Sequence, residues 1–255
     1  MSFRRESGTS PSVGAPRPSL GRRMAAEGVG TALLLAAIVG SGILGVRLAG
    51  GNLAMALLAN AIATGAALVA LILAFGPISG AHLNPAVTLV DAALGDSRWH
   101  EIAGYLAAQV AGAFAGVLAA HVMFEEPLFS TSARARSGPA QAFSEFVATF
   151  GLVSVICGTL RLRSGSVAIA VGAYITGAFW FTASTSFANP AVTLARAATD
   201  TFAGIRPADV PGFLAAELAG AGAAALLWGW LLPAGSRSAP PALAPRVEGS
   251  GEEIS

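Results

Sequence analysis

Two copies of one hexapeptide carry the residues best suited to handling a polar solute. Residues 84–89 read NPAVTL, and residues 189–194 repeat it letter for letter. Asn before Pro predicts a helix start, because the Asn side chain accepts hydrogen bonds at the N-cap and Pro at the first helical position gives up no needed donor. Each tip would present an amide and the positive end of a helix dipole. These tips contain Asn84, Pro85, Ala86, Asn189, Pro190 and Ala191.

The apolar segment after each motif is too short to cross a bilayer. The first runs from Pro85 to about Leu94, where Gly95 and Asp96 stop it. Such a helix of about ten residues spans about 15 Å, roughly half of the apolar thickness of a membrane. Two half-helices entering from opposite faces would meet at the midplane and present both Asn side chains to a shared lumen. That arrangement admits polar solutes and opposes cations.

The composition is that of an integral membrane protein. The 255 residues are 54% hydrophobic and 11% charged, with a mean hydropathy of +0.66, well beyond a soluble domain. A net charge of +1 gives no reason to expect a nucleic-acid partner. Lys is absent while Ala, Gly and Arg are abundant, which points to a high-GC bacterial source and hence to the bacterial inner membrane.

Six segments have spanning length, so an all-α fold of six transmembrane helices and two re-entrant half-helices is predicted. The channel domain should cover residues 25–233, between disordered tails at 1–24 and 234–255 that are rich in Pro, Gly and Ser. Arginines before the first span and between the fourth and fifth place both regions, and both termini, in the cytoplasm. The predicted spans are 25–48, 53–75, 102–123, 142–160, 167–185 and 210–232.

The duplication extends beyond the hexapeptide. Residues 104–113 (GYLAAQVAGA) align without a gap to residues 212–221 (GFLAAELAGA), and the Glu-x-x-x-Thr of Glu27 returns at Glu145. Repeat one therefore covers about 25–123 and repeat two about 142–233. An odd number of spans in each repeat inverts the second copy, which is how the two half-helices come to enter from opposite sides.

Glu27 and Glu145 lie within predicted spans, where a charge is costly and normally faces protein or a water-filled cavity. A proton relay would make the protein an active transporter. The structural interpretation is favoured instead: each carboxylate accepts hydrogen bonds from the irregular backbone that leads into a half-helix. Gln109 and Glu217 receive the same interpretation. For His82, orientation of the loop before Asn84 is favoured over pH gating.

The paired motifs, the duplicated Glu and the sequence SGAHLNPAVT at residues 79–88 resemble the aquaporin and aquaglyceroporin family over about residues 25–232. The resemblance implies a homotetramer among membrane lipids with one pore per subunit, and passive conduction of water or small uncharged solutes. It implies that Asn84 and Asn189 donate hydrogen bonds at the midplane, and that a narrower filter lies toward the outside. Neither an enzyme nor a cofactor or metal is predicted, because the sequence has no metal-spaced His cluster, activated nucleophile or phosphate-binding glycine loop.

The filter is where this chain departs from the family pattern. Most members carry Arg three positions after the second Asn, and this chain has Val192. Counting from the motifs places Thr64, Gly177 and Ser186 at the other filter positions. None of the four is bulky or aromatic, so a wide and weakly polar opening is predicted, with cation exclusion left to the helix dipoles.

Arg196 lies four residues beyond Val192, on the same face of the half-helix. It either reaches back toward the pore mouth or, as favoured here, snorkels outward into solvent. Its counterpart in repeat one is Asp91.

The predicted function is a passive channel for glycerol, urea or metalloid acids such as arsenous acid, together with water. The metalloid suggestion comes from resemblance alone, because bacterial relatives associated with arsenic resistance also lack the filter Arg. A water-selective aquaporin is the alternative within the family. An ion-coupled secondary transporter, which shares inverted repeats and broken helices, is the alternative from another class.

Overall fold

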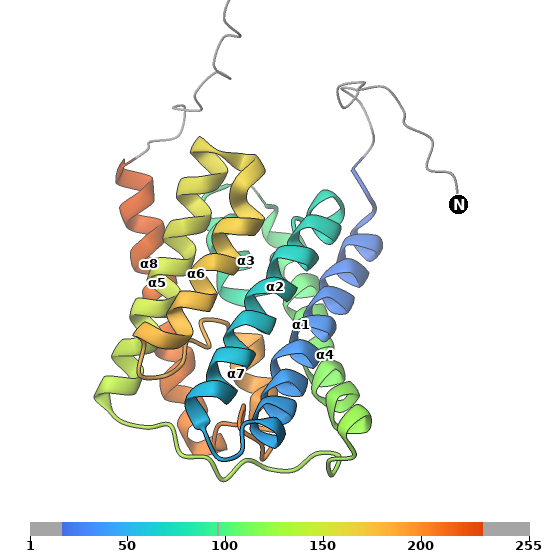
Figure 1. Ribbon diagram of the computed structural model, residues 1–255. Coiled ribbons are helices and arrows are strands. Elements are labelled where there is room, and N and C mark those ends of the chain that lie inside the picture. The colour runs from blue at the N-terminus through green and yellow to red at the C-terminus, as the bar shows by residue number, and fades with distance from the viewer. Residues whose placement is uncertain (1–16, 96, 232–255) are drawn as a thin grey trace, which may run out of the picture.

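The computed structural model describes residues 17–95 and 97–231, and the described chain is all helical apart from its loops. Repeat one contributes four α-helices, and repeat two contributes four more with two short 3-10 turns (Figure 1). The first four are α1 (Leu20–Leu48), α2 (Leu53–Ser79), α3 (Pro85–Ala93) and α4 (Trp99–Phe124). The second four are α5 (Pro139–Leu162), α6 (Val167–Phe181), α7 (Pro190–Arg196) and α8 (Val210–Leu231).

The two repeats pack in the same way. Helix α1 lies against α2 and α4, α5 lies against α6 and α8, and α2 meets α6 where the repeats join. Helix α1 begins and α8 ends at the same end of the bundle, and the segment between α4 and α5 crosses the opposite end (Figure 1). The half-helices α3 and α7 lie in opposite halves of the bundle. The order of elements and the directions of α3 and α7 are those of an inverted repeat.

Small residues let the long helices of each repeat cross closely. A Cβ on Gly112 of α4 would lie 2.1 Å from the carbonyl oxygen of Gly28 in α1. At the equivalent crossing of repeat two, a Cβ on Gly220 of α8 would lie 2.4 Å from the carbonyl oxygen of Phe146 in α5. Both contacts are far below van der Waals distance, so only Gly permits these crossings.

The ends of the predicted spans differ from those of the observed helices by up to five residues. Five helices are long and apolar enough to cross a membrane, while α6 has only 15 residues. A helix of that length rises about 22 Å. The predicted span 167–185 ended too late, because α6 ends at Phe181 and the backbone of Thr182 is already extended, with φ of −107° and ψ of 138°. The predicted tail 1–24 was also too long, since α1 begins at Leu20. The rest of that tail before Arg17, and the predicted tail 234–255, lie outside the described residues.

Candidate functional site: a lumen between two half-helices

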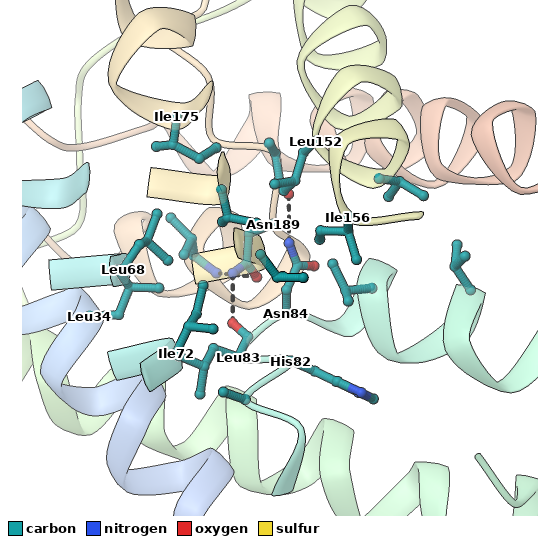
Figure 2. Close-up of a pocket in the computed structure, with 18 of the residues that line it drawn as sticks. Leu34, Leu68, Ile72, His82, Leu83, Asn84, Leu152, Ile156, Ile175 and Asn189 are labelled. Atoms are coloured by element: carbon teal, nitrogen blue, oxygen red, sulfur yellow. Dashed lines mark hydrogen bonds between the residues drawn. The ribbon is translucent and has the colours of Figure 1, made fainter. Parts of the chain in front are cut away.

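The two half-helices meet tip to tip, and their Asn side chains join the loops of the two repeats. The Nδ2 atom of Asn84 donates to the carbonyl oxygen of Ala188 at 2.8 Å, and that of Asn189 donates to the carbonyl oxygen of Leu83 at 2.8 Å (Figure 2). An amide nitrogen carries two hydrogens. Each Asn therefore keeps one donor beyond the bond that joins the loops.

The same Asn residues start the helices, as their motif predicts. The Oδ1 atom of Asn84 accepts from the backbone N–H of Ala86 at 2.9 Å. The Oδ1 atom of Asn189 accepts from Ala191 at 3.0 Å and from Val192 at 3.3 Å. One side chain thus caps its own half-helix and fixes the opposite loop. The amide orientation follows from these contacts, since exchanging oxygen and nitrogen would break all of them.

Glu27 holds the loop that precedes α3. Its carboxylate, fully buried, accepts the backbone N–H groups of His82 at 3.0 Å and Leu83 at 2.7 Å. It also accepts the side chains of Ser79 at 2.6 Å and Gln109 at 2.7 Å. Buried charge is tolerated when every oxygen is satisfied by donors. All four contacts are structural, and they leave no oxygen of Glu27 facing the lumen.

Glu145 and Glu217 do the same for repeat two. The Glu145 carboxylate accepts the backbone N–H groups of Phe187 at 2.9 Å and Ala188 at 2.8 Å. Glu217 accepts the N–H of Asn189 at 3.3 Å and the hydroxyl of Thr193. Glu217 stands where repeat one has Gln109, whose amide donates to Glu27 and to the hydroxyl of Thr88 and accepts no bond from the loop.

Both loops adopt backbone conformations that residues with a Cβ seldom take. Ala81 and Leu83 have φ of 46° and 50°, and Ser186 and Ala188 have φ of 50° each. Such residues persist where the surroundings fix them. Glu27 binds the N–H of Leu83 and Glu145 binds that of Ala188, while the N–H groups of Ala81 and Ser186 donate to the hydroxyls of Ser79 and Ser184. These bonds hold the loops as non-helical backbone in the lumen wall.

His82 lines the lumen on the α3 side. Its Nδ1 lies 3.1 Å from the hydroxyl oxygen of Thr88, and its Nε2 lies 3.7 Å from an oxygen of Asp91. The imidazole also meets the ring of Tyr105, with centroids 5.6 Å apart. Contacts with α3 and α4 therefore hold the ring between the loop and the half-helix, which fits the loop-orienting interpretation.

A cavity of about 260 Å³ passes between the half-helices. Its wall includes both motif Asn residues, the C-terminal part of α3 at Asp91 and the last residue of α7, Arg196. Apolar side chains make up most of the rest, and Figure 2 shows several of them around the two Asn residues. These are Leu34, Leu68, Ile72, Leu152, Ile156 and Ile175. A narrow apolar wall with a few polar groups lets small neutral molecules pass by exchanging hydrogen bonds.

Three of the four predicted filter residues line this lumen. Thr64, Ser186 and Val192 are buried and belong to its wall. The hydroxyl oxygens of Thr64 and Ser186 have no hydrogen-bond partner among the described residues. Both residues belong to the lumen wall, and each hydroxyl oxygen is itself almost fully enclosed.

The prediction for Gly177 is wrong. Gly177 is exposed and does not belong to the lumen wall. It follows Ile169 and Ala173 at intervals of four along α6, and all three are exposed, whereas Phe179 is buried and lines the lumen. Counting back from the motif gave the wrong helix face, because the segment between α6 and α7 is not helical. The ring of Phe179 therefore lies in the lumen wall, although no aromatic side chain was predicted at the filter.

The favoured prediction for Arg196 is also wrong. Its residue exposure is 2%, its Nε donates to the carbonyl oxygen of Ala203, and its guanidinium carbon lies 3.4 Å from the centroid of the Phe187 ring. Helical spacing put Arg196 on the lumen face correctly. The segment after α7 folds back over the side chain and keeps it from solvent, and the sequence carries no local signal for that.

A second buried guanidinium lies near the same end of the lumen. Arg136, from the segment between α4 and α5, donates to the carbonyl oxygens of Gly204 at 2.8 Å and Ser184 at 3.0 Å. Burial lowers its pKa to about 10, so it stays cationic at pH 7. Unlike Arg196, Arg136 is not part of the lumen wall. Its contacts tie three loops together.

Two capped half-helices that meet tip to tip beside a cavity fit a membrane channel. The described residues contain no cluster of three or more His, Cys, Asp or Glu side chains that could hold a metal ion. The sequence pattern of the Major intrinsic protein family matches residues 15–166. The chain belongs to that family, whose members are channels and not enzymes.

Relatives agree with this assignment. The chain is 56% identical to the protein named aquaglyceroporin AqpS of Rhizobium meliloti (strain 1021) over 213 residues, which covers 84% of this chain and 91% of that one. It is 35% identical to aquaporin NIP6-1 of Arabidopsis thaliana over 64% of this chain, and it spans 54% of that protein's length. The X-ray structure of the aquaglyceroporin from Plasmodium falciparum superposes with a TM-score of 0.64 at 21% identity, covering 84% of this chain and 95% of that one, which shows a common fold.

Proposed function

We propose that this protein is a passive channel for small uncharged polar solutes such as glycerol, urea and undissociated metalloid acids, together with water. The observation that carries the proposal is Val192 in the lumen wall, at the position where most family members have Arg. A buried Val offers no hydrogen bonds and less bulk than Arg, so the lumen beside the second motif is more open and less polar.

The other wall residues near Val192 favour neutral solutes that are larger than water and carry hydroxyl groups. Thr64 and Ser186 supply hydroxyls without described partners, and Phe179 supplies an apolar ring. A polyol or a hydroxylated metalloid acid has hydroxyls that can bond to Thr64 and Ser186, and a less polar side that can contact Phe179. The name aquaglyceroporin carried by the 56% identical relative supports this choice of solutes.

We also propose that the protein lies in a bacterial inner membrane as a homotetramer, with both termini in the cytoplasm. Helix α1 begins and α8 ends at the same end of the bundle, and the predicted cytoplasmic Arg-rich regions flank that end. In this orientation the α3 end of the lumen faces the cytoplasm, and the α7 end faces outward.

Stopped-flow light scattering on proteoliposomes tests the proposed function. Native protein should raise glycerol and arsenous acid permeability well above that of empty liposomes. Val192→Arg should lower the permeability of both solutes more than that of water, and Val192→Met, similar in length but uncharged, should lower them less. If native vesicles pass water alone, the protein is a water-selective aquaporin and the proposed filter is wrong.

A gradient experiment separates a channel from a transporter. Passive conduction equilibrates glycerol across the bilayer and is unaffected by a protonophore or by an imposed sodium gradient. An ion-coupled transporter would accumulate solute above the external concentration. Accumulation that collapses with the ion gradient would contradict the proposal.

A further inference from the structure

The two repeats share a contact that their motifs alone do not reveal. In each, the residue two positions before the motif Asn touches the residue seven positions after it. In repeat one these are His82 and Asp91, with Nε2 and Oδ2 3.7 Å apart. In repeat two they are Phe187 and Arg196, with the guanidinium carbon 3.4 Å from the ring centroid. All four residues belong to the lumen wall.

The shared geometry carries opposite charge in the two repeats. Seven helical residues advance about 10 Å along an axis. Asp91 and Arg196 therefore lie on opposite sides of the Asn84–Asn189 contact, each about that far from it. The lumen has an acid toward one end and a base toward the other, although the backbone around them is nearly symmetric.

The guanidinium of Arg196 is held in place without being neutralised. Its flat group stacks on Phe187, and its Nε donates to the carbonyl oxygen of Ala203. Within the described residues no carboxylate lies within ion-pair distance, and no hydrogen bond engages its two terminal nitrogens. Stacking and one backbone contact restrict the side chain, its other N–H groups have no partner among the described residues, and the residue belongs to the lumen wall.

We propose that Arg196 is the residue that excludes cations and orients solute oxygens at the α7 end of the lumen. The proposal rests on the channel function above and assigns a selectivity-determining residue to it. Arg196 offers fixed donors to a hydroxyl or carbonyl oxygen, as a guanidinium does wherever planar recognition is needed. Val192, one helical turn closer to the motif, leaves room for the larger solute while Arg196 supplies the charge.

The expected size of the cation barrier follows from Coulomb's law. A unit charge about 6 Å from a monovalent cation, at an effective dielectric constant of about 20, lowers the cation's occupancy about a hundredfold. Helix dipoles at the Asn tips add to the barrier at the midplane. Removal of the charge should therefore raise cation flux strongly while neutral solutes continue to pass.

The test measures potassium and glycerol flux in proteoliposomes for Arg196→Gln, Arg196→Lys and Arg136→Gln. Arg196→Gln keeps donors but removes the charge, and it should raise potassium flux at least tenfold with glycerol flux retained. Arg196→Lys keeps the charge and should exclude potassium as the native protein does. Arg136→Gln is the matched control, because it removes a buried Arg at the same end that does not line the lumen, and its potassium flux should stay at the native level.

Three outcomes decide the matter. If Arg196→Gln passes glycerol and still excludes potassium, the assignment is overturned. Equal potassium leaks from Arg196→Gln and Arg136→Gln also overturn it, because the leak then comes from loosened loops. If native protein passes no glycerol, the channel function fails instead. Should Arg196→Gln not fold, Arg196→Met, uncharged and of similar length, takes its place.

Discussion

Replacement of Glu27 by Gln should destabilise the fold and close the lumen. Each oxygen of the Glu27 carboxylate accepts two hydrogen bonds, one pair from Ser79 and His82 and the other from Leu83 and Gln109. A Gln side chain keeps one acceptor oxygen and places an NH₂ group where the other was. The NH₂ is tolerated best beside Ser79, whose hydroxyl is able to turn and accept.

The magnitude follows from the contacts that remain. The backbone N–H of His82 would face the new NH₂ without an acceptor, and an unsatisfied buried donor costs about 1–3 kcal/mol. Two further bonds, from Leu83 and Gln109, change from charged to neutral acceptors, and each loses about 1 kcal/mol. The free energy of unfolding should therefore fall by about 3–5 kcal/mol, with the loop before Asn84 most affected.

Titration with SDS in mixed micelles measures the free energy of unfolding, and stopped-flow light scattering measures glycerol permeability of the same variant. Glu125→Gln is the control: Glu125 is exposed at the end of α4, and no hydrogen bond of its side chain occurs among the described residues. It should change stability by less than about 0.5 kcal/mol. If Glu27→Gln matched this control within about 1 kcal/mol, the view that a buried carboxylate fixes the loop would be refuted.

Three further predictions concern other parts of the pore. Asn84→Asp keeps the capping oxygen but loses the donor to Ala188, so it should lower the free energy of unfolding by about 1–3 kcal/mol and reduce glycerol flux; native values in both measurements would contradict this. Gly220→Leu should prevent α5 and α8 from packing, because a Cβ there meets the Phe146 carbonyl at 2.4 Å, and the protein should aggregate on a sizing column. Gly222→Leu, with nothing within 4 Å, should elute normally from the same column. Thr64→Val should reduce glycerol flux several-fold by removing a lumen hydroxyl, while Thr149→Val, at a buried hydroxyl outside the wall, should not; equal effects would show that the Thr64 hydroxyl does not serve the solute.

The half-helices could be predicted because their signals are local. An Asn cap, a Pro at the first position and Gly95 beyond the end gave 85–94, and the helix observed is Pro85–Ala93. The duplicated Glu residues could be assigned to loop support because irregular backbone in a membrane needs buried partners. Exact repetition of the hexapeptide then implied the inverted fold.

The errors arose where a distant part of the chain decides the outcome. Helix α6 stops at Phe181 because the next residues form a loop held by Glu145 on another helix. Within α6, Gly177 and Phe179 lie on different faces, and only Phe179 belongs to the lumen wall. Arg196 is buried by a segment that returns over α7. Neither the end of α6 nor the burial of Arg196 can be predicted from the residues next to it in sequence.

The reciprocal bonds between the Asn side chains and the opposite loops have a consequence for how the protein is made. Asn84 needs the carbonyl of Ala188, and Asn189 needs the carbonyl of Leu83, so neither tip reaches its final position before the other repeat has been synthesised and inserted. During translation the Asn84 side chain has no partner in repeat two until more than a hundred further residues have been synthesised. Completion of the pore therefore requires both repeats, and an isolated first repeat would lack both of these bonds.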